Sequence, residues 1–380
     1  MNSKVTFDSS PDPGTINFGV GQPSSDLLPV ELMRAASDSF LSLAQPNEFN
    51  YGARQGDVRF RETLASFLSK GYEEPVSSGS LFVTCGNSQA LDFICALFTR
   101  PGDTVIVEEP SYFLAFRIFT DHGLNIISVP VDEDGLNIDR LEKVLEHSQP
   151  RLLYTIPSYH NPGGQTMSLE RRQRLAALSR EHSFLIAADE VYQLLHYYDP
   201  PPAALGTMTD TGSILSLGSF SKILAPGLRL GWIQTSPDLM GKLMDSGAVN
   251  SGGSFNHFTS HIVRHAIELG LQDAFLRQLR DAYRRRVEVM DEVLREHIGQ
   301  LASWKRPEGG YFFWLKFHDS VDIAELRRHA PDFNTGFQPG ENFSAHAGLQ
   351  NYMRLSFAHY NEDAIIEGIK RLANLLHHKL

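Results

Sequence analysis

Short apolar runs alternate with helical patterns through the middle of this chain. The runs occupy residues 81–84, 104–107, 126–129, 152–155, 184–188, 214–217 and 231–234. Segments between them, such as Ser88–Leu97 and Leu169–His182, carry apolar residues at helical spacing. Runs that are apolar at every position are typical of strands covered on both faces. The pattern therefore predicts an α/β fold, in which a mostly parallel sheet is flanked by helices.

The pattern changes after about Phe255, where a long helical stretch begins and continues to about His297. Beyond it come a strand-like run at 311–317, a short helix at 322–329, a second strand-like run at 352–358 and a final helix. This order predicts a second, smaller α+β domain.

The other end of the chain, up to about Pro29, is rich in Pro, Gly, Ser and Asp, which indicates an irregular arm outside any core. We therefore expect three parts: residues 1–45 as the arm and the start of the small domain, 46–270 as the large domain, and 271–380 as the small C-terminal domain.

Charge and cysteine content narrow the possible partners. The formal net charge is −11, which argues against nonspecific nucleic-acid binding, because such binding needs clustered Lys and Arg. The two cysteines, Cys85 and Cys95, suggest no disulfide framework and fit a reducing cytoplasm. The first residues lack the apolar segment of a signal peptide, and no apolar run is long enough to span a bilayer. We expect a cytoplasmic protein that binds neither membrane nor nucleic acid.

The first segment with chemical potential is VTCGNSQAL at 83–91. A predicted strand ends at Thr84, Gly86 makes a turn, and a helix begins near Ser88. Unpaired N–H groups at a helix start bind phosphate well, and Gly86 lets the backbone come close. Taken alone, the segment also fits an ordinary strand-to-helix joint in which Ser88 caps the helix.

A second segment, SFSKILAPGLRLGW at 219–232, follows a buried strand directly. Ser219, Ser221 and Arg229 are suited to hold a dianionic phosphate, because the guanidinium fork matches its oxygens. Lys222 stands among small residues, where partial desolvation would lower its pKa and favour the free amine. The alternative is a polar loop with a surface lysine.

Two further segments place polar residues after buried strands. Asp189 and Glu190 follow an apolar run, at the strand end where α/β proteins bind ligands. A buried Asp needs a partner, and a protonated pyridine nitrogen would be one, although a helix or turn cap is the simpler reading. Asn161 lies in a Pro- and Gly-rich loop within 154–170, where its amide would face a fixed ligand atom.

Together, in this order and spacing, the segments resemble the class I and II aminotransferase family, whose fold-type-I enzymes depend on pyridoxal 5′-phosphate (PLP). The resemblance covers essentially the whole chain and is closest to the 2-aminoadipate and kynurenine aminotransferase-like branch. The motifs that carry it are NFGVGQPSSDLLP, YGARQGD, VTCGNSQAL, EEPSY, HNPGG, DEVY, SFSK, GLRLGW and YMRLSFA. Each motif is weak by itself, but the ordered set is specific.

The resemblance implies a role for each matching residue. Lys222 would hold PLP as a Schiff base and later move the proton between the substrate Cα and the cofactor. Asp189 would pair with the protonated pyridine nitrogen, which keeps the ring an electron sink. Tyr112 would stack on the ring, and Tyr192 and Asn161 would hydrogen-bond its O3′. Lys222, Asp189 and Tyr112 are thus the expected catalytic residues.

The remaining roles concern the phosphate, the substrate and the partner subunit. The phosphate would be held by Asn87, Ser88, Ser219, Ser221 and Arg229. Tyr51 would reach the phosphate in the partner subunit's site, so the resemblance implies a homodimer with shared active sites. Arg354 would bind the substrate α-carboxylate, a task for a bidentate guanidinium, while Gly21 and Asn161 would also lie against the substrate.

Two residues depart from the family pattern. Asn87 stands where relatives often carry Ser or Gly, although a backbone N–H contact to phosphate would survive this change. Gly163 gives NPGG where NPTG is commoner, so the loop lacks one hydroxyl. Neither departure affects the expected cofactor.

The resemblance implies transfer of an amino group from an L-amino acid to a 2-oxo acid, with 2-oxoglutarate as the expected acceptor. The same cofactor residues serve fold-type-I lyases, decarboxylases and specialised biosynthetic enzymes, so the motifs leave these reactions open. A ligand-sensing module of a transcription regulator is the alternative from another class, and the short arm and acidic charge argue against it.

Two smaller expectations concern the substrate and metals. The N-terminal arm, the area near Tyr51 and loops such as 251–257 offer no obvious second arginine for a distal carboxylate, which favours a neutral or aromatic amino donor. His257, His261 and His265 recur at four-residue spacing and would share a helix face. No carboxylate or cysteine cluster accompanies them, so we expect no metal site.

Overall fold

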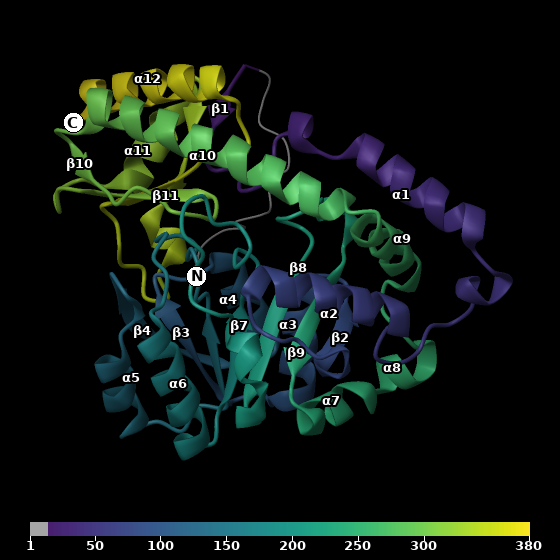
Figure 1. The fold of residues 1–380 in the computed structure, drawn as a ribbon. Coiled ribbons are helices and arrows are strands. Elements are labelled where there is room, and N and C mark those ends of the chain that lie inside the picture. The colour runs from purple at the N-terminus through teal and green to yellow at the C-terminus, as the bar shows by residue number, and fades with distance from the viewer. Residues whose placement is uncertain (1–13) are drawn as a thin grey trace.

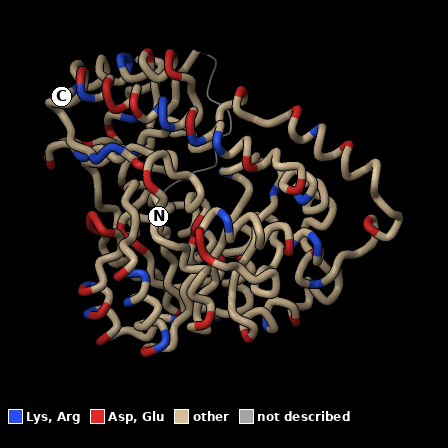
Figure 2. The backbone as a smooth tube through the Cα atoms, viewed as in Figure 1, with Lys and Arg blue, Asp and Glu red and all other residues tan. Residues whose placement is uncertain are grey.

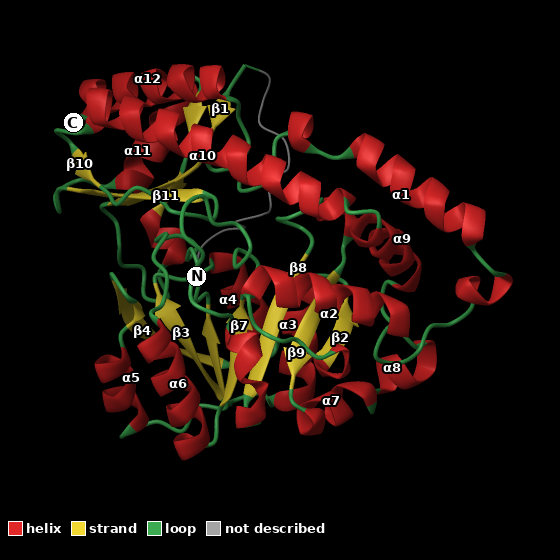
Figure 3. Cartoon of the chain, viewed as in Figure 1, coloured by secondary structure: helices red, strands yellow, loops and turns green. Residues whose placement is uncertain are grey.

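A computed structural model describes residues 14–380, and the first part of the predicted arm lies outside the described residues. Its largest element is an eight-stranded sheet with helices on both faces (Figure 1 and Figure 3). In spatial order the strands are β2 (Leu81–Thr84), β9 (Gly231–Thr235), β8 (Ile214–Ser219), β7 (Leu185–Asp189), β6 (Leu152–Thr155), β3 (Thr104–Glu109), β4 (Asn125–Asp132) and β5 (Gly135–Leu136). Only β9 and β5 run against the others, which confirms the predicted mostly parallel α/β sheet.

Neighbouring residues of the central strands enter two different cores. In β6, Leu152 and Tyr154 join the larger core while Leu153 joins the smaller one. The larger core is covered by α2 (Val58–Tyr72), α3 (Asn87–Phe98) and α4 (Phe113–Asp121), and the smaller by α5 (Ile138–Leu145) and α6 (Leu169–His182). Because successive strand residues point to opposite faces, burial of both faces explains why whole runs are apolar.

A smaller antiparallel sheet lies above the carboxyl ends of the large sheet's strands (Figure 1). Its strands, in order, are β10 (Ala302–Ser303), β11 (Phe312–Phe317), β14 (Tyr352–Ser356) and β13 (Gln338–Pro339). The elements around it are α10 (Leu271–Ile298), α11 (Ile323–His329), α12 (Glu362–Lys379) and a short parallel pair, β1 (Ile16–Asn17) with β12 (Thr335–Gly336). This matches the predicted smaller α+β unit.

Two expectations about local structure are wrong. The continuous helix expected from Phe255 to His297 is broken into α9 (His257–Glu268) and α10, because Gly270 between them adopts a φ of +71°. The N-terminal arm is also not wholly outside the core, since Phe18 is fully buried and its carbonyl accepts a hydrogen bond from the Ser356 N–H. Buried Val20 and Leu27 and the pairing of β1 with β12 anchor the same stretch, although it is rich in turn residues.

The remaining helices lie at the periphery: α1 (Val30–Leu43), α7 (Pro237–Met244) and α8 (Gly247–Gly252). Helix α1 runs along the outer edge of the molecule and packs against α9 (Figure 1). Positive and negative residues are interspersed along the visible helices, as Figure 2 shows. Within residues 14–380, no helix combines the length and apolar character needed to cross a membrane.

Candidate active site

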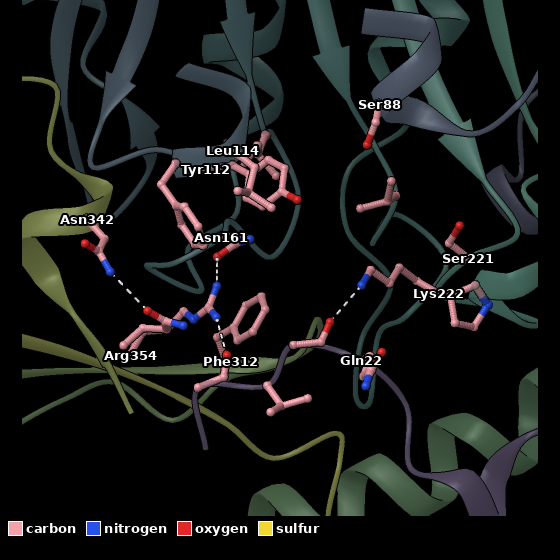
Figure 4. Close-up of a pocket in the computed structure, with 18 of the residues that line it drawn as sticks. Gln22, Ser88, Tyr112, Leu114, Asn161, Ser221, Lys222, Phe312, Asn342 and Arg354 are labelled. Atoms are coloured by element: carbon pink, nitrogen blue, oxygen red, sulfur yellow. Dashed lines mark hydrogen bonds between the residues drawn. The ribbon is translucent and has the colours of Figure 1, made fainter. Parts of the chain in front are cut away.

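A pocket of about 940 Å³ lies between the large sheet and the small one (Figure 4). It is bounded by residues that follow β3, β6, β7 and β8 and by residues of β11, β13 and β14, at the edge where open α/β sheets bind ligands. Of the predicted site residues, those that line it are Gly21, Asn87, Ser88, Tyr112, Asn161, Asp189, Tyr192, Ser219, Ser221, Lys222, Arg229 and Arg354. The structure thus brings together residues from distant parts of the sequence.

Lys222 follows β8 and extends into the middle of the pocket. Its Nζ donates a hydrogen bond to the Gly21 carbonyl at 3.0 Å and lies 4.9 Å from the centre of the Tyr311 ring. Burial and, next, the positive charge of Arg354 lower the pKa of Lys222 to about 8. The Asp189 carboxylate acts in the opposite direction, but its effect is smaller than that of Arg354. A free amine is therefore accessible near neutral pH, which is what a nucleophilic lysine needs.

Asp189 ends β7 at the bottom of the pocket. One carboxylate oxygen accepts a hydrogen bond from Asn87 Nδ2 at 2.7 Å, and the other accepts one from the Tyr154 hydroxyl at 2.8 Å. Burial raises the pKa of Asp189, and the two hydrogen bonds offset part of that rise by favouring the charged form. The carboxylate is therefore held in place and faces any cation in the pocket.

Glu190, the neighbouring acid, serves the fold instead. Its carboxylate accepts hydrogen bonds from Ser216 Oγ at 2.6 Å and from two N–H groups at residues 205 and 206, and it lies 3.6 Å from the Arg172 guanidinium. Successive strand residues point to opposite faces, so only one of the two acids can reach the pocket.

Hydrogen-bond donors gather around the N-terminus of α3. Ser219 Oγ donates to Ser221 Oγ at 2.9 Å, and Arg229 Nη1 donates to Ser221 Oγ at 3.4 Å. Ser88 lies on the same side of the pocket (Figure 4). Gly86 precedes the helix with a φ of +85°, and a Cβ there would come within 2.9 Å of Arg229 Nη2. This combination of helix start, hydroxyls and guanidinium suits a phosphate dianion.

Arg354 on β14 forms the other end of the site and is 3% exposed. Its guanidinium donates to Asn161 Oδ1 at 2.9 Å and to the Gly19 carbonyl at 3.1 Å, and it lies 4.0 Å above the Phe312 ring. Burial lowers the pKa of Arg354 to about 10. Within residues 14–380 no carboxylate pairs with it, so a buried positive charge faces the pocket ready for an anion.

Comparison with known proteins identifies the family. The model of the class I and II aminotransferases matches residues 13–372. The chain belongs to this aminotransferase family. Aromatic-amino-acid aminotransferase 1 of Thermococcus litoralis is 33% identical over 366 residues, which are 95% of this chain and 88% of the relative.

Solved structures agree with this assignment. The kynurenine aminotransferase of Pyrococcus horikoshii, in complex with PMP, has a TM-score of 0.90 at 32% identity and covers 97% of this chain and 92% of its own. The α-aminoadipate aminotransferase of Thermus thermophilus, complexed with N-(5′-phosphopyridoxyl)-L-leucine, has a TM-score of 0.87 at 29% identity and covers 96% and 93%. The predicted family, branch and fold-type-I architecture are confirmed.

The protein is therefore a PLP-dependent aminotransferase, and its pocket fits the cofactor. The donors at the start of α3 match the phosphate, Asp189 matches a protonated ring nitrogen, and the Lys222 amine lines the same pocket. When bound, PLP acts as the electron sink that makes the substrate Cα acidic. Tyr112 and Tyr192 add aromatic walls, and burial raises the pKa of Tyr112 to about 12, so this hydroxyl stays protonated.

A buried pair supports the Asn161 loop of this aminotransferase. His160 Nε2 lies 3.1 Å from Glu108 Oε2, and both side chains are 1% exposed. The Gly163 N–H donates to His160 Nδ1 at 3.2 Å, which ties the imidazole to the loop that carries Asn161. The sequence analysis missed this pair, although Glu108 at the end of an apolar run was a signal comparable to Asp189.

The far end of the pocket holds residues that the sequence analysis did not consider. Arg327 and Arg328 on α11 line it together with Asn342, and Figure 4 shows the Asn342 side chain. Gln338 Oε1 accepts hydrogen bonds from Arg327 Nη1 and from Asn342 Nδ2, both at 3.0 Å. The expected donor preference was drawn from the N-terminal arm, the area near Tyr51 and loops such as 251–257, and these arginines lie outside all three.

Two predicted features lie outside the pocket. Tyr51 is 83% exposed in the single chain and touches no part of the site. His261 Nε2 lies 3.2 Å from His257 Nε2, and His261 stacks on Phe40, while His265 Nδ1 lies 2.9 Å from Ser39 Oγ. In the part of the chain that the structure describes, no three His, Cys, Asp or Glu side chains gather as metal ligands do.

Proposed function

We propose that this aminotransferase holds PLP covalently through Lys222 and transfers the amino group of an L-amino acid to 2-oxoglutarate. The single observation that carries this is the position of Lys222 Nζ, in the same pocket as the Asp189 carboxylate and the Arg354 guanidinium and within reach of the charges of both. An amine there reaches both the cofactor aldehyde and the substrate Cα. With its pKa near 8, Lys222 also suits a proton carrier.

The other site residues position the reactants. Asp189 holds the ring nitrogen in its protonated form, Tyr112 stacks on the ring, and Tyr192 and Asn161 bind O3′. Asn161 also accepts a hydrogen bond from Arg354, so the same side chain links the cofactor and substrate ends of the site. The phosphate is held in this proposal by Asn87, Ser88, Ser219, Ser221 and Arg229.

Arg354 binds the substrate α-carboxylate in this proposal. Its burial and the absence of a carboxylate partner in the described part of the chain support the role, because a desolvated guanidinium gains most from an anion. The Gly21 carbonyl, which accepts the hydrogen bond from Lys222, lies over the substrate.

We further infer that the enzyme is a homodimer with shared active sites. Tyr51 is fully outside the pocket of its own chain, as expected of a residue that reaches the partner's phosphate. Exposed apolar side chains accompany it, namely Leu41, Leu43, Phe49, Val58 and Phe258. Such a surface is typical of an interface.

Domain organisation and location complete the proposal. The eight-stranded sheet falls within residues 46–270 and the four-stranded sheet within 271–380, which supports these as the two domains. The free cysteines, Cys85 and Cys95, fit a reducing cytoplasm.

The half-reaction tests the proposal. Wild-type enzyme mixed with an L-amino acid, without an acceptor, should release one 2-oxo acid and convert the cofactor absorbance to that of its amine form. Release of CO₂ or ammonia without that conversion would show another fold-type-I reaction. Borohydride should fix PLP to the wild-type chain and leave Lys222→Ala unlabelled.

The amino donor has two candidate classes. The pocket has apolar and aromatic walls, formed by Val20, Phe113, Leu114 and Phe312. Such walls favour an aromatic donor, like that named for the Thermococcus litoralis relative. Arg328 at the far end favours a donor with a distal carboxylate, like that named for the Thermus thermophilus relative. A donor screen separates the classes, and Arg328→Gln should raise KM only for dicarboxylic donors. The same screen with 2-oxoglutarate and pyruvate tests the acceptor.

A further inference from the structure

The Asn87 side chain turns toward the ring end of the site and away from the phosphate end. It is the first residue of α3, yet its Nδ2 donates to Asp189 Oδ1 at 2.7 Å and to the Leu217 carbonyl at 3.1 Å. Both N–H bonds of the amide are thus used, and both acceptors lie at the carboxyl ends of β7 and β8.

These acceptors also fix which way the amide faces. A carboxylate and a backbone carbonyl accept hydrogen bonds only, so the NH₂ group must face them. The opposite orientation would place the Asn87 carbonyl oxygen against the Asp189 carboxylate, where two acceptors repel each other. Asn87 Oδ1 therefore has a defined direction.

That oxygen is buried and has no hydrogen-bond partner in the range 14–380. Buried carbonyl oxygens are rarely left without a donor, because their desolvation is then uncompensated. This oxygen is enclosed by protein atoms even though the pocket is open, so the contact of Asn87 that bears on a ligand is the Nδ2 hydrogen bond to Asp189, which lines the pocket beside it.

We propose that Asn87 is a positioning residue for the cofactor ring, because its Nδ2 hydrogen bond orients the Asp189 carboxylate toward the ring N–H. The inference rests on the proposed function, in which Asp189 faces the ring nitrogen. It assigns the side chain of Asn87 to a different end of PLP from the phosphate contact expected from its place in the sequence. Its backbone N–H at the start of α3 stays available to the phosphate.

The Asp189 environment explains why such a residue matters. Burial raises the pKa of Asp189, and hydrogen bonds from Tyr154 and Asn87 are the two largest effects that lower it. Loss of the Asn87 amide removes one of two side-chain donors, so Asp189 becomes a weaker partner for a cation. A Ser at this position would keep a hydroxyl for the phosphate but is too short to span the same distance.

Binding of PLP and of pyridoxal, which lacks the phosphate, tests the assignment with the full-length chain freed of cofactor. Asn87→Ser should weaken binding of both ligands about tenfold, as expected for one charge-assisted hydrogen bond. Ser88→Ala is the matched control at the phosphate end and should weaken PLP while leaving pyridoxal unchanged. Loss of PLP affinity alone in Asn87→Ser, or no loss for either ligand, would overturn the inference.

A second variant and a spectrum exclude a merely structural effect. Tyr154→Phe removes the other donor to Asp189 and should show the same equal loss for both ligands. In Asn87→Ser the absorbance of the bound cofactor should titrate at a different pH from wild type, because ring protonation has changed. An unshifted titration with intact binding would contradict the role of Asn87. These outcomes can be told apart from a failure of the proposed function. That failure would be seen in the half-reaction of the wild-type enzyme and in the borohydride labelling of Lys222→Ala.

Discussion

Replacing Lys222 with methionine should stabilise the PLP-free protein, because burying the charged form of this amine lowers the free energy of unfolding. Burial and the charges of Arg354 and Arg229 lower the pKa of Lys222 from 10.5 to about 8. At about 1.4 kcal/mol per pH unit, the difference corresponds to at most about 3 kcal/mol of folding free energy below pH 8. The lost hydrogen bond to the Gly21 carbonyl offsets about 1 kcal/mol, so the expected net gain is about 2 kcal/mol.

The pH dependence of this gain is the diagnostic part of the prediction. Below about pH 8 Lys222 is protonated in both the folded and the unfolded chain, and the folded state bears the full cost. Between pH 8 and 10.5 the folded protein holds a neutral amine while the unfolded chain still binds the proton, so wild-type stability rises with pH. The advantage of Lys222→Met is therefore largest below pH 8 and fades toward pH 10.5.

Urea unfolding of the PLP-free proteins at pH 7 and pH 10 measures this difference. All samples are compared at one chain concentration, because the apparent stability of an oligomer would depend on that concentration. Lys305→Met, at an exposed lysine, is the control and should change the free energy of unfolding little at either pH. A gain that is equal at both pH values, or a loss at pH 7, would refute the desolvation argument.

Further predictions concern cofactor attachment, substrate binding, the interface and the core. Attachment of PLP to the cofactor-free enzyme should speed up with pH around a midpoint near 8, since only the neutral Lys222 amine attacks; a midpoint near 10.5 would contradict this. Arg354→Gln should raise KM for the amino donor about tenfold or more in steady-state assays, as expected for loss of one charged contact. Tyr51→Ala and Lys222→Ala should each be nearly inactive. When the two variants are mixed and re-equilibrated, about one quarter of wild-type activity should return, because half of the dimers carry one intact site. No recovery would exclude shared sites. Arg172→Met should lower the free energy of unfolding by about 3 kcal/mol or more in urea, because it leaves the buried Glu190 carboxylate without its cation.

The sheet was predictable because its strands are buried on both faces. Ile106 and Leu153 pack into one core while their neighbours pack into the other, so the sequence shows continuous apolar runs. The break at Gly270 was less visible, since a single Gly within a long periodic pattern is compatible with a helix. Phe18 was missed because its burial depends on strands that lie more than 300 residues later.

The membership of the site was predictable, but several side-chain directions were not. Residues such as Lys222 and Asp189 stand at strand ends, so their position follows from the fold. The direction of Asn87 depends on the Asp189 carboxylate, a contact across 102 positions that no local pattern records. Arg327 reaches the pocket only because α11 packs beside β13, and that packing is set by the small sheet.

The arrangement of charges couples substrate binding to proton transfer. Arg354 is the largest electrostatic cause, after burial, of the low pKa of Lys222. A substrate carboxylate bound to Arg354 would neutralise that guanidinium, and the pKa of Lys222 would then rise. Lys222 is thus a weak base while the site is empty and a stronger one once the substrate lies in place. In the proposed function, Arg354, which would recognise the substrate, would therefore also prepare the Lys222 amine that would remove the Cα proton.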